Sequence, residues 1–306
     1  MNARRAVIAG GSGFIGRALT RELVGRGFEV MILTRSPRQR TDGVVEVAWD
    51  GIRTGPWVAC IDGAYAVINL TGKNINCPQT PENLRAIITS RVSSVNAIAS
   101  AIGSAQEPPK VWVQASAVGF YGDTGQQAGD ETTPAGTDVL ADICRQWEAA
   151  FNEAPAPTTR KVTLRIGFVL GRDGGALPVL SKLTRLFLGG AAGSGRQYIS
   201  WIHLADQAAM FAAAVAENAM AGVFNAVAPN PVTNAEFMRE LRRTLHRPWS
   251  PPAPAMAVKI GARLMGSEGS LALISQRCLP RKLLSLGFRF RFSDLEAALA
   301  DLCGKG

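Results

Sequence analysis

The stretch AVIAGGSGFIGRAL, residues 6–19, decides the fold expected for this chain. Its first four residues predict a buried strand, and apolar residues at helical spacing follow the glycines. Gly10, Gly13 and Gly16 form a G-x-x-G-x-x-G turn, through which backbone N–H groups and a helix N-terminus can approach a pyrophosphate. The stretch therefore predicts a dinucleotide site, with a purely structural turn as the alternative. The residues assigned to the cofactor here are Gly10, Ser12, Gly13, Phe14, Ile15 and Gly16.

Strand and helix patterns alternate along the next 150 residues. Strands are expected at 29–35, 44–49, 64–70, 110–116 and within 161–171, and long helices at 81–102 and 138–154. This alternation predicts an α/β protein, a doubly wound parallel Rossmann sheet with helices on both faces. We expect a Rossmann domain over 1–226, with a substrate-side insertion at about 171–198. Residues 227–306 are expected to form a small, mixed and mostly helical C-terminal domain.

The end of the second expected strand indicates which dinucleotide binds. NAD sites usually place Asp or Glu here to bond the ribose hydroxyls, whereas a carboxylate would repel the 2′-phosphate of NADP. No acidic residue occurs between Glu29 and Asp42. Arg35 is the predicted 2′-phosphate ligand, and the alternative is a surface arginine on a loop. The residues expected to help are Thr34, Ser36 and Arg38.

Composition excludes several other classes of protein. The chain is 47% hydrophobic and 19% charged, without an apolar run near the roughly 18 residues of a membrane span. The apolar run after Arg4 and Arg5 is too short for a signal peptide. Five scattered cysteines without C-x-x-C indicate a reducing cytosol rather than disulfides or zinc, and two histidines exclude a His-rich metal site.

The net charge of +9 fits solvated faces or attraction of a polyanionic dinucleotide. No nucleic-acid motif accompanies it. We therefore expect a cytoplasmic protein that binds NADP(H) and an unknown small molecule, without metal, nucleic acid or membrane. A homodimer is compatible with the sequence.

Seven motifs occur in order across nearly the whole chain: GGSGFIG (10–16), NLTG (69–72), SAVGFYG (116–122), WEAA (147–150), RIGFVLG (165–171), GSGRQYISWIH (193–203) and GVFNAVAPNPVTN (222–234). Together they resemble the atypical, extended short-chain dehydrogenase/reductases of the nucleoside-diphosphate-sugar epimerase-like type. Some members of that family carry a cell-division-inhibitor label. The stretch at 279–299 resembles the small domain of unknown function that ends the family. The resemblance implies an extended Rossmann fold with NADP across the sheet edge, and it names no substrate.

The resemblance also implies roles for residues at the strand ends. Leu70, Thr71 and Gly72 would line the adenosine and pyrophosphate. Ala115 and Ser116 would lie under the nicotinamide, which Ile166 and Gly167 would border. Arg196, in the loop GSGRQ, would face the substrate, and a glycine turn with a surface arginine is an equal alternative.

Reductases of this family use a Ser or Thr after the fifth strand and a Tyr-x-x-x-Lys pair, whose members share one helix face. When the sequences are aligned on Tyr121 and Gly122, the hydroxyl position falls on Ala117, beside Ser116. The tyrosine position falls on Cys144 and the lysine position on Glu148, so all three are altered. A thiol, with an ordinary pKa of roughly 8.5, could donate a proton, but the sequence shows no cation to tune it.

Ser116 and Tyr121 remain as candidate catalytic residues, although a packing role is the more common one for such a tyrosine. The first hypothesis is an NADP-dependent oxidoreductase or epimerase with a non-standard proton donor. The second is a non-catalytic NADPH-binding sensor or scaffold, which the altered tyrosine and lysine positions favour. The polar loop around Arg196 favours the first. A cell-division role rests on the label alone.

Overall fold

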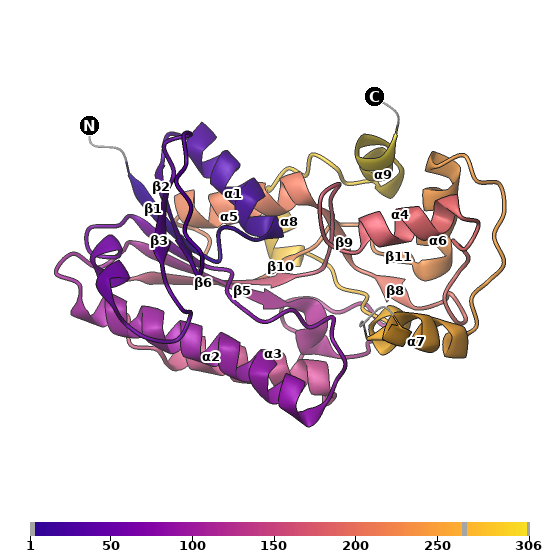
Figure 1. The fold of residues 1–306 in the computed structure, drawn as a ribbon, viewed down its shortest axis with the longest axis horizontal. Helices are drawn as coiled ribbons and strands as arrows, with labels where there is room; N and C mark the ends of the chain where they lie inside the picture. Colours follow the sequence, from indigo (N-terminus) through magenta and orange to yellow (C-terminus); the bar gives the residue numbers. More distant parts are fainter. Residues whose placement is uncertain (1–3, 265–267, 305–306) are drawn as a thin grey trace.

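The computed structural model describes residues 4–264 and 268–304. Within these residues the central sheet has seven strands, all parallel, in the order β10-β6-β5-β4-β1-β2-β3 (Figure 1). This is the predicted doubly wound Rossmann arrangement. The strands are β1 (Arg5–Ala9), β2 (Glu29–Thr34), β3 (Val45–Ala48), β4 (Ala66–Asn69), β5 (Val111–Ala117), β6 (Arg160–Ile166) and β10 (Gly222–Ala226).

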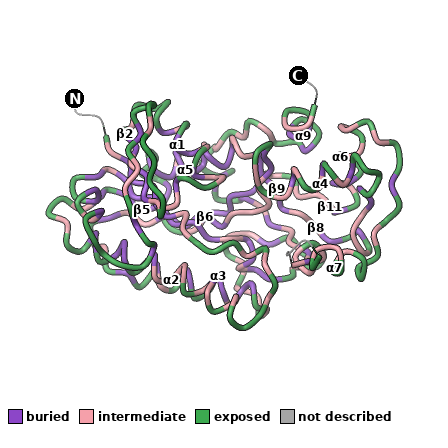
Figure 2. Tube along the Cα trace, viewed as in Figure 1, coloured by how far each residue is buried: buried purple, intermediate pink, exposed green. Residues whose placement is uncertain are grey.

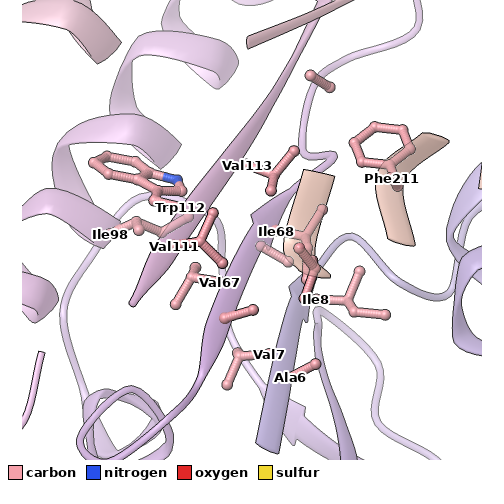
Figure 3. Close-up of a cluster of buried hydrophobic side chains, with 14 of the residues drawn as sticks. Ala6, Val7, Ile8, Val67, Ile68, Ile98, Val111, Trp112, Val113 and Phe211 are labelled. Carbon is pink, nitrogen blue, oxygen red and sulfur yellow. The ribbon is translucent and has the colours of Figure 1, made fainter. Parts of the chain in front are cut away.

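Two pairs of helices cover the two faces of this sheet. Helices α1 (Phe14–Gly25) and α5 (Leu204–Ala216) pack together on one face, and α2 (Pro81–Ser104) and α3 (Val139–Glu153) on the other (Figure 1). Because both faces are covered, β4 is buried at every position, as a parallel strand should be. Figure 3 shows Trp112 and Ile98 on one side of the core strands and Phe211 on the other.

A second lobe follows the sixth strand. It contains β7 (Phe168–Leu170), α4 (Leu177–Arg185), β8 (Tyr198–Ile199), β9 (Trp201–His203), β11 (Val232–Thr233), α6 (Asn234–Thr244), α7 (Ala255–Leu264) and α9 (Leu295–Cys303). Helix α8 (Arg281–Ser285) instead packs against β10 of the main sheet. Short 3-10 turns are η1 (Pro56–Cys60), η2 (Val118–Tyr121) and η3 (Gly269–Leu273). Strand β8, which precedes the expected domain boundary at residue 226, pairs with β11, which follows it. The expected division into two domains at that residue stays a prediction.

Two features differ from the sequence expectation. The single run expected within 161–171 is divided between β6, in the main sheet, and β7, which pairs with β9. The division falls at Gly167, where a β-carbon would clash with the carbonyl oxygen of Ser200. Helix α7 was not expected after its prolines, and none of its residues is buried (Figure 2). No helix among the described residues is long and apolar enough to cross a membrane.

Residues 291–301, near the C-terminus, contact the start of α5 through hydrogen bonds and a ring stack. His203 caps this helix, because its Nδ1 accepts a hydrogen bond from the backbone N–H of Ala205 at 3.0 Å. Its ring stacks on Phe292 with centroids 3.9 Å apart, and its Nε2 lies 3.3 Å from Oδ2 of Asp301. Asp206 accepts the backbone N–H groups of residues 291 and 292 at 2.7 and 2.9 Å. His203 therefore both caps α5 and contacts the C-terminal segment.

Candidate functional site

The glycine turn between β1 and α1 is shaped by backbone contacts. Gly10 has φ +78°, and a β-carbon on it would lie 3.2 Å from the carbonyl carbon of Leu70. A β-carbon on Gly16 would lie 2.5 Å from the α-carbon of Gly11, so only glycine lets the helix pack on the turn. Gly13 caps α1 without a side-chain hydrogen bond, and the first turn has no acidic residue. The N–H groups and positive dipole end of α1 are therefore available to an anion.

The end of β2 lies beside this turn. Ser12 Oγ and Thr34 Oγ1 are 3.2 Å apart, so the turn and the strand end share a hydrogen bond. Arg35, Ser36 and Arg38 follow on the surface. Among the described residues, no hydrogen bond or ion pair engages the guanidinium of Arg35 or Arg38.

The next arginine in the loop differs. Arg40 forms ion pairs with two carboxylates, from Nη2 to Oδ2 of Asp42 at 2.5 Å and from Nη1 to Oε1 of Glu46 at 3.2 Å. The loop thus carries one arginine neutralised by the protein and two with free donors.

The loop after β4 completes the same edge. The backbone N–H of Leu70 donates a hydrogen bond to the carbonyl of Ala9, at the end of β1. The side-chain oxygen of Thr71 is buried and has no hydrogen-bond partner in the described part of the protein. A buried hydroxyl without a partner is rare in a protein and indicates water or a ligand group. Gly72 is exposed beside it.

The expected nicotinamide end lies at the carboxyl ends of β5 and β6. The two strands are in register, with Ser116 opposite Arg165 and Ala117 opposite Ile166. Alternate residues of a strand point to opposite faces, and Trp112 packs on Phe151 of α3. Ser116 therefore faces α3, whereas Ala117 faces the other side. The structure thus brings the expected residues at the ends of β5 and β6 together. Ser116 and Ala117 lie on opposite faces of the sheet.

A buried ion pair occupies the position of the family's lysine. Arg165 donates two hydrogen bonds to Glu148, from Nε to Oε1 at 2.9 Å and from Nη2 to Oε2 at 2.8 Å. Ser116 Oγ donates to the same Oε1 at 2.6 Å. All three residues are at most 5% exposed. Glu148 is thus neutralised within the protein by a cation from β6.

Tyr121 belongs to the same network. Its hydroxyl donates to Oδ1 of Asn225 at 2.7 Å and accepts from Nη1 of Arg165 at 2.9 Å. The ring of Phe120 also lies 3.4 Å from Cζ of Arg165. Burial raises the pKa of Tyr121 to about 12, although Arg165 opposes this shift. Tyr121 is 4% exposed, and this arrangement favours a packing role over proton donation.

Cys144, at the tyrosine position, is also buried. Burial, and next the charge of Glu148, raise the pKa of its thiol to about 12, so the thiol stays protonated near neutral pH. The sequence interpretation that no cation is near was wrong, because the charges of Arg91 and Arg165 both act on the thiol. Sequence reasoning missed both arginines. Arg165 could have been noticed as a charge near the carboxyl end of a strand expected to be buried, where a charge demands a partner.

Two further expected residues lie at the junction with the second lobe. Phe14 packs on the glycines of residues 171–175, where a β-carbon on Gly171 would be 2.5 Å from its ring. Arg196 is exposed in its loop, and its carbonyl accepts a hydrogen bond from Gln126 at 3.4 Å. Among the described residues its guanidinium has no partner.

Comparison with known proteins agrees with this geometry. Residues 6–226 match the model of the NAD dependent epimerase/dehydratase family, and residues 253–302 match a domain of unknown function, DUF1731. The chain therefore belongs to the NAD dependent epimerase/dehydratase family. The expected family and C-terminal domain are confirmed, whereas nothing supports the cell-division label.

Similar proteins come from distant organisms. The chain is 37% identical over 304 residues to the epimerase family protein SDR39U1 of Bos taurus, covering 97% of this chain and 99% of that protein. It is 34% identical to the epimerase family protein YfhF of Bacillus subtilis, covering 96% of each. The crystal structure of human SDR39U1 (isoform 2), solved with NADPH, superposes with a TM-score of 0.88 at 35% identity, covering 98% of this chain and 99% of that one.

Proposed function

We propose that this protein binds NADP(H) at the carboxyl edge of its sheet. The observation that carries the proposal is the pair of unengaged arginines, Arg35 and Arg38, beside an uncapped helix N-terminus without acidic residues. Arginine can bind a 2′-phosphate, and an N-terminus can bind a pyrophosphate. The presence of NADPH in the human relative's structure supports the same cofactor.

Each part of the cofactor has candidate residues. The turn at residues 10–16 and the start of α1 would bind the pyrophosphate. Arg35 would bind the 2′-phosphate, with help from Thr34, Ser36 and Arg38. Thr71, between Leu70 and Gly72, has a buried hydroxyl without a partner that would form a hydrogen bond with the adenosine or pyrophosphate part of the cofactor. The nicotinamide would lie by Ala115, Ser116, Ile166 and Gly167. When bound, NADP(H) supplies hydride transfer.

The activity proposed is that of an NADP-dependent epimerase or reductase, an oxidoreductase of the short-chain dehydrogenase type. Its substrate would be a small carbonyl or a sugar-nucleotide-type compound, with Arg196 on the substrate side. The usual proton donor is absent, because Cys144 carries a buried thiol with a pKa of about 12. The Ser116 hydroxyl donates a hydrogen bond to Glu148, which leaves the lone pairs of its oxygen to accept a hydrogen bond from a substrate hydroxyl. Ser116 would orient the substrate rather than protonate it.

A second function, a non-catalytic NADPH sensor or scaffold, is favoured by one observation. The network of Ser116, Glu148, Arg165 and Tyr121 satisfies its members internally, so none is left poised as an acid. We also propose a cytoplasmic location, consistent with five free cysteines. A homodimer stays a proposal, to be checked by the mass of the particle in solution.

Calorimetric titration of NADPH, NADP and NADH tests the cofactor. Wild-type protein is expected to bind NADPH at least tenfold more tightly than NADH. Arg35→Ala should remove most of that preference, because it removes a charged hydrogen bond to the 2′-phosphate. Arg21→Ala, an exposed arginine on α1, is the matched control and should change nothing. An Arg35→Ala variant with unaltered NADPH affinity would refute the 2′-phosphate assignment.

Turnover separates the two functions. NADPH oxidation is followed at 340 nm with a panel of small aldehydes, ketones and nucleotide sugars. Oxidation with any member supports the reductase. An epimerase returns the hydride and leaves the cofactor unchanged overall, so each nucleotide sugar is also incubated with NADP and analysed for a new epimer, whose formation supports the epimerase. Tight NADPH binding with neither oxidation nor epimer formation, together with a strong preference for reduced over oxidised cofactor, supports the sensor.

A further inference from the structure

Arg91, on α2, is a partly buried arginine that the protein does not neutralise. Its Nη1 donates to two backbone carbonyls, those of Lys73 at 2.9 Å and Ile87 at 3.1 Å. Among the described residues, no carboxylate forms an ion pair with it and no acceptor engages its Nε or Nη2. Burial lowers the pKa of Arg91, which shows that the surroundings disfavour its charge. A desolvated cation without an anion is costly.

Three other buried or partly buried cations have more partners in the protein. Arg165 has the carboxylate of Glu148. Arg160 donates to three backbone carbonyls, those of residues 214, 215 and 220, and Lys161 to those of 151, 152 and 154. Arg91 has neither a carboxylate nor a third carbonyl, and both of its carbonyl acceptors bind Nη1, so the donors of Nε and Nη2 have no acceptor among the described residues.

The end of the Arg91 guanidinium, with both Nη1 and Nη2, lies against Gly72. A β-carbon on Gly72 would stand 3.1 Å from Cζ, 3.2 Å from Nη1 and 3.3 Å from Nη2. The backbone of Gly72 does not have a positive φ, so the missing side chain is not required by conformation. It is explained by the guanidinium, which any larger residue would displace or cover. Gly72 is exposed, so this side of Arg91 borders the surface at the carboxyl edge of the sheet.

The opposite flank of Arg91 is the helix that should carry the tyrosine and lysine. Cζ of Arg91 lies 4.8 Å from the ring centroid of Trp147, next to Glu148. Its charge also acts on Cys144, one turn earlier. A cation is therefore present beside the altered Tyr-x-x-x-Lys positions, but it comes from α2.

We propose that Arg91 binds an anionic oxygen group, a phosphate or a carboxylate, of a ligand at the carboxyl edge of the sheet. The planar guanidinium suits such a group, because Nε and Nη2 can donate two parallel hydrogen bonds. The group belongs either to the dinucleotide or to the second substrate, and in both cases the inference rests on the function proposed above. Arg91 then supplies the positive charge that the family's lysine would supply from α3.

The test compares Arg91→Met with Arg85→Met, an exposed arginine on the same helix. NADPH affinity is measured by calorimetry. Inorganic phosphate and malonate are then titrated, with and without NADPH, while the indole N–H signal of Trp147 is followed in 15N spectra. That signal is assigned with Trp147→Phe. The signal is expected to shift when an anion binds beside Arg91. If Arg91 had only a structural role, an added anion would not bind there and the signal would not shift.

Two outcomes support the proposal and also identify the source of the anion. If Arg91→Met weakens NADPH tenfold or more, as loss of a charged hydrogen bond should, the group belongs to the dinucleotide. If NADPH affinity is kept but the Trp147 response to phosphate or malonate is lost, the group belongs to the second substrate. Arg85→Met should behave as wild type in both arms.

One outcome overturns the proposal. If Arg91→Met leaves NADPH affinity and the anion responses unchanged, Arg91 only fastens the loop after β4. Should that variant not fold, Arg91→Gln replaces it, because the amide can still donate to the carbonyl of Lys73, and the same criteria apply. A wild-type protein that binds no dinucleotide refutes the proposed function instead, and the anion titration without NADPH still decides the role of Arg91.

Discussion

Glu148 and Arg165 form a buried ion pair with two hydrogen bonds, which joins α3 to β6. The two hydrogen bonds are 2.9 and 2.8 Å long, and each residue is 5% exposed. Ser116 and Tyr121 each add one hydrogen bond to the pair. The charge of Glu148, at the position that the sequence analysis assigns to the lysine, is thus neutralised by the protein itself.

Glu148→Gln should destabilise the protein strongly. The amide has the shape of the carboxylate but leaves Arg165 as an uncompensated buried charge, which costs about 3–5 kcal/mol. Urea unfolding measures the difference. Asp142→Asn is the matched control on the same helix, because its partner Arg145 is half exposed and such pairs contribute less than about 1 kcal/mol. Equal small losses in both variants would contradict a large contribution of the buried ion pair to stability.

Tyr121→Phe should affect stability and leave function intact. It removes the acceptor of Arg165 Nη1 and the donor to Asn225, at a cost of about 1–3 kcal/mol. NADPH affinity and any NADPH oxidation should stay at the wild-type level. Tyr65→Phe is the control, since no described hydrogen bond involves its hydroxyl. A large loss of turnover with unchanged stability would instead make Tyr121 the proton donor.

The sequence predicted the elements whose causes are local. The buried strands, the amphipathic helices and the glycine turn follow from hydrophobic period and from the space that Gly16 requires, and all appear within a few residues of their expected bounds. The assignment of positions 144 and 148 to the tyrosine and lysine, made by counting from Tyr121, stays a prediction.

What replaces the altered residues could not be found that way. Arg165 lies 17 positions from Glu148, and Asn225 lies 104 from Tyr121, so only the packing of β5, β6 and β10 brings them together. The same holds for Arg91, which meets Trp147 because α2 packs on α3. Local pattern does not contain such long-range pairings.

Gly16→Ala should impair both the fold and cofactor binding. Its methyl group would lie 2.5 Å from the backbone of Gly11, which can yield only if α1 moves off the turn. We expect a loss of about 1–3 kcal/mol in unfolding free energy and a NADPH affinity at least tenfold weaker. Gly25→Ala, near the end of the same helix, meets no atom within 4 Å and should be neutral or slightly stabilising. Wild-type NADPH affinity in Gly16→Ala would contradict the proposed pyrophosphate site.

His203 should make stability fall in mild acid. Burial lowers its pKa below the usual value, outweighing Asp301 and Asp206, which raise it, while Arg291 lowers it further. Above the unfolded pKa of about 6.5 the ring is neutral in both states, and the stability is complete. As the pH falls below that value, the unfolded chain takes up the proton first, so stability declines until the pH passes the folded pKa.

His203→Asn isolates this contribution. The asparagine oxygen can still cap the N–H of Ala205, but the side chain does not titrate. The variant loses the stack on Phe292 and is less stable throughout, so the informative quantity is the change in unfolding free energy between pH 7.5 and 5.5. Wild-type protein should lose more over this interval than His203→Asn. His246→Asn, at the other histidine, should lose as much as wild type. A greater loss in His203→Asn would show that the folded protein holds a protonated His203 against Asp301.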